Sequence, residues 1–382
     1  METIQYCTIC LYNSTLSGIS FDFDGKCNYC YQIDQIKSIY QPTSDVGKEL
    51  LDKIINEIKL KGQGKKYDCV VGISGGTDSS FLLMKCIDWG LRPLAVHYDN
   101  TWNSAIASQN IYKITNELKV DLFTYVVNYA ESNDLKLSFL KARVREFDAD
   151  TDIAFIQTLR SVASKHRIKY ILEGHSFLTE GLTPVGSNYL DGAYVRDVHK
   201  KFGSIKLRTF PNMTLIQFLK WILIFRQKFI RPLWYIPYSK EEARKELVER
   251  LGWKYYGGHH LENYSSNFAH SVWLPEKFNL DYRILTLAAD VREGRISKTT
   301  GLHELLSARH KQADLSKYLL ARLDLSSQEL ATLITGQQRN WREFKTYKKF
   351  FESFRFIFYV FAKINLVPMS FYIKYCKKDK VK

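Results

Sequence analysis

The sequence predicts an α/β fold in which helices cover both faces of a doubly wound parallel sheet. Short runs of β-branched and apolar residues alternate with helical patterns from about residue 45 to about residue 175, the rhythm of repeated strand–helix–strand units. Polar clusters fall at the ends of three of these runs, at 74–79, 97–100 and 173–175. Since parallel strands end at one edge of a sheet and ligands collect there, the clusters predict a single site at that edge.

The expected elements can be given in chain order. A helix is predicted over 45–61, and strands are predicted over 67–73, 94–99, 122–127 and 170–172. Further helical patterns cover 80–84, 152–166, 239–251, 304–310, 315–323 and 326–334. The polar, glycine-bearing segment 179–203 is expected to be a long loop over the site. The end of the chain, 341–382, is expected to form helices covering the sheet and a basic tail that contains Cys376.

The turn after the first strand, Ser74 to Ser79, has the composition of a phosphate-binding loop. Gly72, Gly75 and Gly76 remove side chains where a backbone approaches a ligand, and the N–H groups of the following helix start can hold an anion. The side chains of Ser74, Thr77 and Ser79 add hydroxyl donors. A carboxylate beside a phosphate makes sense mainly when it holds a divalent cation, so Asp78 is predicted to bind Mg2+.

Two better-known glycine fingerprints do not fit this turn. No lysine follows the glycines, as a Walker loop requires, and the glycine spacing differs from that of a dinucleotide fold. The run 74–79 resembles the pyrophosphate loop (PP-loop) of the N-type ATP pyrophosphatases, whose domain is HUP-like. This resemblance implies ATP as a cofactor, bound by Gly72, Ile73, Ser74, Gly75, Gly76, Thr77, Asp78, Ser79, His97, Asp99, Gly174 and His175. A generic glycine-rich turn remains the alternative, as do a core role for His97 and a turn role for Asp99.

Four cysteines near the N-terminus form two pairs with metal-ligand spacing. Cys7 and Cys10, then Cys27 and Cys30, match the four-thiolate pattern of a structural zinc ribbon, in which no coordination position stays open. An iron–sulfur cluster and a pair of disulfides are the alternatives. We therefore expect three parts: a Zn2+ ribbon over 1–40, the ATP pyrophosphatase domain over 41–210, and a helical region over 211–382 that contacts substrate or partners.

Composition narrows the partners without choosing among them. The 382 residues are 45% hydrophobic with a net charge of +15, which suits a globular protein that meets a nucleotide, a nucleotide sugar, RNA or an anionic membrane surface. The N-terminus does not resemble a signal peptide, so a cytoplasmic location is expected. The apolar stretch 215–230 carries three basic residues and is expected to be a helix that packs on the core or a partner, with peripheral membrane contact as the alternative.

Three further segments, 179–203, 231–238 and 252–263, together with the ribbon and the loop, resemble the N-acetyl sugar amidotransferases of bacterial surface-polysaccharide and flagellar sugar biosynthesis. The resemblance extends from Cys7 to beyond Glu293. It implies a lipopolysaccharide (O-antigen) or flagellar pathway and a C–N ligase that adenylates the acetamido oxygen of a nucleotide-linked sugar. Ammonia then replaces AMP to give an acetamidino group.

The resemblance also implies the remaining site residues. Asp78, Glu180, His260 and Glu262 are the catalytic candidates, because amidine formation requires proton removal from ammonia. The sugar candidates are Glu180, Tyr256, Gly257, Gly258, His259, His260 and Asn263. Each can instead be a solvated loop residue. His259 stands where the family usually has a lysine after the paired glycines.

The source of ammonia is expected to be a partner. No glutaminase nucleophile is visible once the ribbon cysteines are set aside. The resemblance implies a separate glutaminase and a barrel subunit similar to those of imidazole-glycerol-phosphate synthase.

The main alternative is a tRNA-thiolating PP-loop enzyme, which explains the charge but requires a sulfur-carrying cysteine among Cys69, Cys86 and Cys376. A module that only binds nucleotide or RNA is the third possibility, against which the metal-holding carboxylate of Asp78 argues. Nucleic acid is therefore not the favoured partner.

Overall fold

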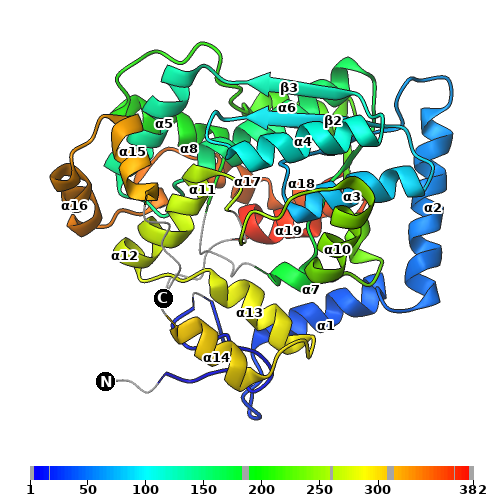
Figure 1. The fold of residues 1–382 in the computed structure, drawn as a ribbon, viewed down its shortest axis with the longest axis horizontal. Coiled ribbons are helices and arrows are strands. Elements are labelled where there is room, and N and C mark those ends of the chain that lie inside the picture. Colours follow the sequence, from blue (N-terminus) through cyan, green and yellow to red (C-terminus); the bar gives the residue numbers. More distant parts are fainter. Residues whose placement is uncertain are drawn as a thin grey trace.

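A computed structural model describes residues 4–16, 18–182, 189–258, 261–307, 314–364 and 366–377 (Figure 1). Its centre is one parallel sheet with the strand order β3-β2-β1-β4-β5. The strands are β1 (Cys69–Gly72), β2 (Pro93–Asp99), β3 (Leu122–Val126), β4 (Tyr170–Leu172) and β5 (Lys228–Ile230). The doubly wound parallel sheet predicted from the sequence is confirmed.

Helices cover both faces of the sheet because the central strands are apolar on both sides. Along β1, Cys69 and Val71 pack into one core cluster and Val70 packs into another, as the alternation of side chains requires. The first cluster includes residues of α2 (Asp45–Gly62), α3 (Thr77–Asp88), α4 (Ala105–Glu117) and α10 (Lys240–Leu251). The second is closed by α6 (Ala149–Lys165).

The fifth strand corrects the expectation of one helix over 215–230. Helix α9 (Leu215–Leu223) begins with a capping box formed by Thr214 and Gln217 and ends before a turn. In that turn Arg226 has a left-handed φ of 48°. β5 then pairs with β4 at the sheet edge. Among the described residues no helix is both long and apolar enough to cross a membrane.

The segment 179–203 is not the single loop that the sequence suggested. Helix α8 (Gly192–Phe202) occupies its second half, and Asp191 caps it by accepting a hydrogen bond from the backbone N–H of Tyr194 at 2.7 Å. Tyr194 and Val198 are buried against α5 (Tyr129–Ala142). Helix α7 (Phe177–Glu180) forms the start of the segment.

The last third of the chain is helical. Its α-helices are α11 (Tyr264–Phe268), α12 (Leu274–Phe278), α13 (Arg283–Arg292), α14 (Lys298–Leu306), α15 (Leu315–Leu323), α16 (Ser327–Thr335), α17 (Lys348–Ser353), α18 (Arg355–Lys363) and α19 (Met369–Phe371). The helix expected over 304–310 starts earlier than predicted, because α14 spans Lys298–Leu306, and residues 308–310 lie outside the described residues. The expectation of an incidental Cys376 in a basic tail was wrong, since its side chain is buried in a cluster with Phe218 and Phe358.

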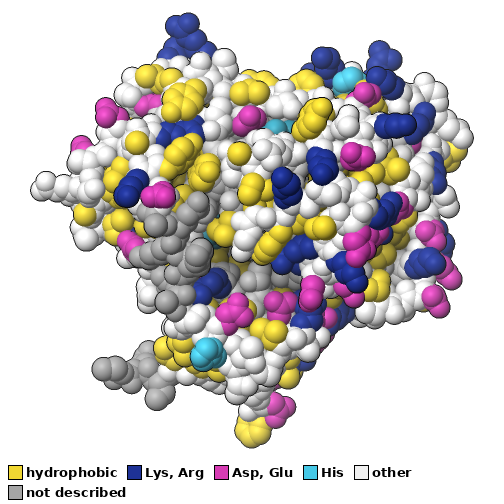
Figure 2. Space-filling view, viewed as in Figure 1, with side chains coloured by type: hydrophobic (Ala, Val, Ile, Leu, Met, Phe, Trp, Pro, Cys, Tyr) yellow, Lys and Arg dark blue, Asp and Glu magenta, His cyan; other side chains and the backbone are white. Residues whose placement is uncertain are grey.

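The N-terminal ribbon packs on this last third. In Figure 1 the blue N-terminal segment and the yellow α13 and α14 lie together below the sheet, and α1 (Asn28–Tyr40) leads from the ribbon towards α2. The core of this part combines the four cysteines with Ile284, Leu287 and Ala288 of α13. Figure 2 shows the molecule hollowed between this part and the sheet, with acidic and basic side chains along the hollow.

Candidate active site

The segment 74–79, called the PP-loop after the loop that it resembles, lies between β1 and α3, and its shape is fixed by Gly75. This residue has φ +80°, and a Cβ atom there would lie 2.4 Å from the carbonyl oxygen of Ala107 on α4. The Gly75 carbonyl accepts hydrogen bonds from Trp253 Nε1 at 3.0 Å and from Asn110 Nδ2 at 3.3 Å. Both conformation and packing therefore require glycine at this position.

The donors of the loop are held by hydroxyl groups. The Ser74 N–H donates to Ser79 Oγ at 3.2 Å, the Gly76 N–H to Ser74 Oγ at 3.3 Å, and the Thr77 N–H to Tyr256 Oη at 3.3 Å. These distances exceed the usual 2.9–3.0 Å, and each acceptor hydroxyl can also donate. The loop at the start of α3 thus offers N–H and O–H donors suited to an anion.

Asp78 is the centre of a half-buried charge cluster. Tyr238 Oη donates to Asp78 Oδ1, and Lys240 Nζ lies 3.0 Å from Asp78 Oδ2 and 3.0 Å from Glu180 Oε1. Burial raises the pKa of Asp78, although Lys240 opposes that shift. Burial would lower the pKa of Lys240, but Asp78 and Glu180 outweigh burial and raise it. Lys240 therefore stays protonated between two carboxylates.

His175 extends the cluster to Trp234. Glu180 Oε2 lies 3.4 Å from His175 Nε2, and Trp234 Nε1 donates to His175 Nδ1 at 3.2 Å. Because Nδ1 accepts from the indole, the neutral ring carries its proton on Nε2, facing Glu180. Burial, together with the positive charge of Arg231, lowers the pKa of His175 to about 3.

The state of His175 predicts a pH dependence of stability. A histidine that is neutral in the folded state takes up a proton on unfolding below pH 6.5, so its contribution to stability falls as pH drops from about 6.5 towards 3. We expect the unfolding free energy of wild type to fall by about 1 to 2 kcal/mol more than that of His175→Asn between pH 7 and pH 4.5 in urea titrations. This is below the full linkage value, because 34% of the side chain is exposed.

The matched control is His303→Asn, which changes an exposed histidine on α14. This variant should follow the wild-type pH profile. Identical profiles for His175→Asn and wild type would contradict a neutral, depressed His175.

The glycines beside the loop serve close packing. A Cβ atom on Gly174 would lie 2.7 Å from the backbone of Asp78, and one on Gly72 would lie 2.4 Å from the Phe155 ring. Gly174 thus lets the end of β4 approach the first turn of α3, and it brings His175 next to Asp78. These two glycines are therefore explained by packing, and their contact with ATP stays a prediction.

His97 and Asp99 are already engaged by protein groups. His97 Nδ1 lies 2.9 Å from the carbonyl oxygen of Ile73, and its Nε2 lies 2.9 Å from Asn103 Nδ2. Burial lowers the pKa of His97, so it is a neutral link between β2 and β1. Asp99 Oδ1 accepts from the Thr101 N–H at 2.7 Å, the turn role considered as its alternative. The geometry does not favour ATP contacts by these two side chains.

The segment after α10 closes the other side of the loop. A Cβ atom on Gly76 would lie 3.2 Å from both Tyr256 Oη and Glu262 Oε1, so both side chains adjoin the loop. Asn263 caps α11 and donates to the side-chain oxygens of Asn100 and Asn103 at 2.9 and 3.0 Å. Gly257, with φ +99°, and Gly258 form the turn before Leu261. His259 and His260 lie outside the described residues.

Sequence reasoning missed Lys240, Tyr238 and Trp234 as site residues. They come from one stretch, Arg231 to Lys240, that the sequence had flagged only as part of the family resemblance. One signal was present, because Lys240 is the first residue of α10, where the helix dipole disfavours a cation. In the structure the carboxylates of Asp78 and Glu180 compensate a lysine at this unfavourable position.

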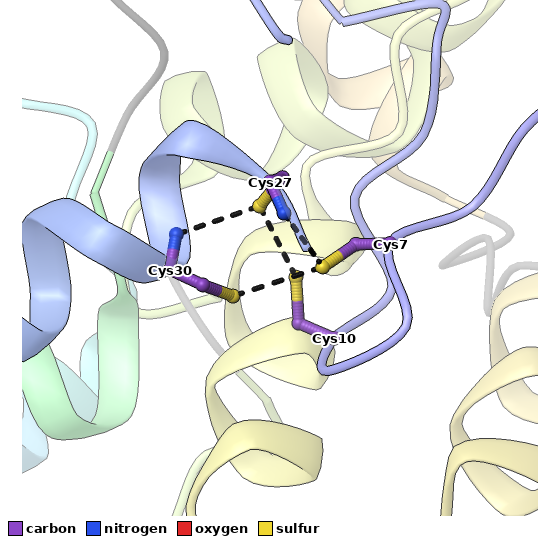
Figure 3. A group of neighbouring side chains, drawn as sticks. All are labelled: Cys7, Cys10, Cys27 and Cys30. Carbon is purple, nitrogen blue, oxygen red and sulfur yellow. Dashed lines mark hydrogen bonds between the residues drawn. The ribbon is translucent and has the colours of Figure 1, made fainter. Parts of the chain in front are cut away.

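The four ribbon cysteines form a candidate metal centre (Figure 3). Their sulfur atoms all lie within 4.8 Å of one another and are buried. The loop 7–10 supplies two of them, and the N-cap and first turn of α1 supply Cys27 and Cys30. Arg292 of α13 donates from Nε to Cys30 Sγ at 3.4 Å, which offsets the charge of thiolates gathered around an ion. The cluster fits a metal site.

The ribbon also contacts the active-site segment. Tyr12 Oη donates to the carbonyl oxygen of Leu182 at 2.9 Å, just beyond Glu180. Ile33 of α1 packs with Phe177 and Trp234, the latter being the hydrogen-bond donor to His175. Helix α13, which packs on the ribbon, also packs against α7. The ribbon therefore supports the backbone that carries Glu180.

Comparison with known proteins bears on the last third of the chain. Residues 262–357, about a quarter of its length, match the family model described as "LPS biosynthesis protein WbpG-like, C-terminal domain". This match confirms, over that region, the resemblance to surface-polysaccharide enzymes. The region begins at Glu262 beside the PP-loop and includes α13, which packs on the ribbon.

Other similarities are more distant. "Uncharacterized protein MJ1599" of Methanocaldococcus jannaschii is 24% identical over 307 residues, which cover 78% of this chain and 92% of that protein. Among solved structures, NMN synthetase from Francisella tularensis covers 74% of this chain and 95% of its own, at 12% identity and a TM-score of 0.33. The match to the U34-tRNA thiolase NcsA from Methanococcus maripaludis, with its [4Fe-4S] cluster, covers 82% of this chain and 92% of that chain, again at 12% identity and a TM-score of 0.33. Structural similarity of this size carries no argument about function.

Proposed function

We propose that this protein is an ATP-dependent amidotransferase of lipopolysaccharide (O-antigen) or flagellar sugar biosynthesis, converting an acetamido group of a nucleotide-linked sugar into an acetamidino group. The observation that carries the proposal is the cluster of Asp78, Lys240, Glu180 and His175 directly at the donor-lined PP-loop. The match of 262–357 to a lipopolysaccharide biosynthesis family supports the substrate class. ATP use is consistent with the cytoplasmic location expected from the sequence.

The chemistry solves the poor leaving ability of an amide oxygen. The amide oxygen attacks the α-phosphate of ATP and pyrophosphate leaves. Ammonia then attacks the activated carbon, and AMP leaves. The N–H groups of 74–79 would hold the pyrophosphate as it gains charge. The cation of Lys240, which pairs with Asp78 of the loop, adds positive charge on the same side.

Asp78 fits a magnesium ion bound mainly through phosphates, which needs only one or two protein carboxylates. The ion would supply charge stabilisation on the departing pyrophosphate. In this structure Lys240 and Tyr238 occupy the two carboxylate oxygens, so they stand where an ion would bind.

Removal of the proton from ammonia is assigned to Glu180 and His175 of the cluster. Amidine formation requires proton removal from ammonia, and Glu180 with the neutral His175 is a carboxylate–imidazole pair suited to that task. Glu262, beside Gly76, faces the loop from the opposite segment and remains a candidate for the sugar side. His259 and His260 stay predictions for sugar contact.

We further propose that the ribbon metal is Zn2+. Four sulfurs at about 2.3 Å from one ion form a tetrahedron with edges of about 3.8 Å. The distances are 3.8 Å between Cys7 and Cys30 and 3.9 Å between Cys10 and Cys27. In a four-iron cluster each thiolate binds a different iron, so the sulfurs lie farther apart. The domain division at residues 40 and 210 remains our proposal.

The proposal is tested by pyrophosphate release from ATP with ammonium. We expect stimulation by one or more members of a panel of UDP- and CMP-linked diacetamido sugars and none by bulk tRNA. Stimulation by tRNA alone would favour the thiolase alternative. That alternative needs an accessible sulfur carrier, whereas all seven cysteines are buried.

The ammonia source gives a separate prediction. Because no glutaminase nucleophile is visible in the sequence, we expect the purified chain to turn over with ammonium chloride and to show no glutamine-dependent turnover. Adding a glutaminase and barrel pair of the imidazole-glycerol-phosphate synthase kind from the same source should restore glutamine use. The measurement is AMP formation with each nitrogen donor. Glutamine-dependent AMP formation by the chain alone would refute the predicted partners.

A further inference from the structure

A cavity of about 240 Å3 lies next to the candidate active site and has no role in the chemistry above. Its walls come from α6, α9, the ends of β4 and β5, and the C-terminal helices. Helix α6 leads into β4, so its N-terminal half, which lines the cavity, lies towards the carboxyl edge of the sheet. The lining is mostly apolar, with aromatic rings such as Phe218, Phe229 and Phe371.

Charged groups are set into this apolar lining. Three cations, Arg160, Arg231 and Lys374, and two carboxylates, Glu173 and Asp191, line the cavity. Arg231 pairs with Glu173, and Lys374 interacts with the charges of Asp152 and Glu146 behind the wall. An apolar cavity with one cation that no carboxylate contacts, here Arg160, suits a ligand that is apolar in body and anionic at one point.

Arg160 places a buried cation in this lining. Its side chain is buried, with 6% of the residue exposed, and its guanidinium lies 4.7 Å from the centre of the Phe229 ring. Nη1 donates to Gln227 Oε1 at 3.3 Å, but Nε has no hydrogen-bond partner among the described residues. A buried cation without a carboxylate in contact is costly, so an anion in the cavity would compensate it.

The cavity adjoins the catalytic cluster through two of its lining residues. Arg231 lines it, and the Arg231 guanidinium lies 5.1 Å from the centre of the Trp234 ring, whose Nε1 donates to His175. Glu173 also lines it, pairs with Arg231 at 2.9 Å, and is two residues before His175. A ligand held in the cavity beside Glu173 and Arg231 would therefore have one end close to the His175 side of the cluster.

We propose that this cavity binds the carrier end of the substrate, an aromatic or apolar body bearing a phosphate, with Arg160 and Arg231 facing the phosphate. The proposal rests on the proposed function only in that the other end of the ligand carries the reacting sugar. Two sources share this chemistry: a pyrimidine nucleoside diphosphate and a prenyl phosphate. The cavity is too small for a whole nucleotide sugar, which fits a ligand that extends out towards His175.

The experiment is equilibrium binding by isothermal titration calorimetry with UDP, CDP, farnesyl phosphate and inorganic phosphate. AMP in excess occupies the PP-loop, so that only a second site is measured. Arg160→Gln removes the buried cation, and Ile156→Trp fills the cavity without changing charge. Lys165→Gln, an exposed cation on the same helix, is the matched control.

We expect UDP or CDP to bind, with Kd raised about tenfold by Arg160→Gln and by Ile156→Trp and unchanged by Lys165→Gln. Binding of farnesyl phosphate with the same sensitivity would support the site and identify a lipid carrier. The proposal is overturned if no organic phosphate binds, or if binding is equal in all variants. If sugar-dependent turnover is unchanged in both cavity variants, the proposed function stands and this site is overturned. If organic phosphates bind with the expected sensitivity but no sugar supports turnover, this site stands and the proposed function is overturned.

Discussion

Replacing Asp78 by asparagine is expected to lower pyrophosphate release about a thousandfold while leaving the fold intact. The substitution keeps the size of the side chain and its hydrogen bond with Tyr238, but it removes the charge that faces Lys240 and would hold Mg2+. Lys240 keeps its contact with Glu180 at 3.0 Å, so no cation is left wholly unpaired. Steady-state pyrophosphate release with ammonium and the nucleotide sugar measures the effect, and thermal unfolding checks the fold.

A carboxylate on the surface provides the control for this variant. Asp121 lies 2.9 Å from Lys66, and both side chains are more than half exposed. Asp121→Asn makes the same chemical change without touching the site, and we expect wild-type turnover. Retention of more than half of the wild-type rate by Asp78→Asn would remove Asp78 from the mechanism.

The second large effect is expected from the ribbon. Cys10→Ser should abolish metal binding, lower the melting temperature by roughly 10 °C and reduce turnover. A structural metal contributes folding energy, and here it holds loops that pack on α13 and contact the segment after Glu180. Elemental analysis should give about one zinc per wild-type chain and none in the variant.

Cys86→Ala is the matched control, because it removes a buried thiol outside the ribbon. It should keep the zinc and cost about 1 kcal/mol of stability. A measured content of about four irons per wild-type chain would show that the site holds an iron–sulfur cluster and not zinc. A Cys10→Ser variant with unchanged metal content would contradict the ribbon assignment.

The sheet could be predicted because its strands carry their own signal. β1 and β4 are short apolar runs and β2 begins with one, as expected of parallel strands buried on both faces. β5 has only three residues, all partly exposed at the edge, so no pattern distinguishes it from the helix before it. Pairing with β4 decides its conformation, and this information lies 58 residues away along the chain.

Helices α5 and α8 escaped prediction because their buried faces are partly polar. Glu131 of α5 accepts hydrogen bonds from the N–H groups of 208–210, and Asp134 accepts from Ser204 and lies 2.7 Å from His199 of α8. These polar side chains are buried only because tertiary partners satisfy them. On the basis of hydrophobic pattern alone, such segments look like solvated loops.

The candidate site also has one part that the sequence could predict and one part that it could not. The loop 74–79 is a local structure, since its glycines and hydroxyls act within six residues, and it could be predicted. The cluster around Asp78 is not local, because Tyr238 is 160 residues away in sequence. Only the fold brings Lys240 and Trp234 to the PP-loop, so their roles became visible with the structure.

The packing of the ribbon sets an order of events during synthesis. Its four cysteines lie within residues 7–30, so they can close around a metal as soon as they leave the ribosome. The residues that hold the ribbon against the rest of the protein are made much later. Arg292, which contacts Cys30, follows it by 262 residues, and Lys298, which donates to the Cys7 carbonyl, follows Cys7 by 291 residues. At about 5–20 residues per second, the first-made part waits on the order of 10 to 60 s for its partner helices. With the metal proposed above, loading would precede docking and would keep the four thiols from oxidation while the rest of the chain is being made.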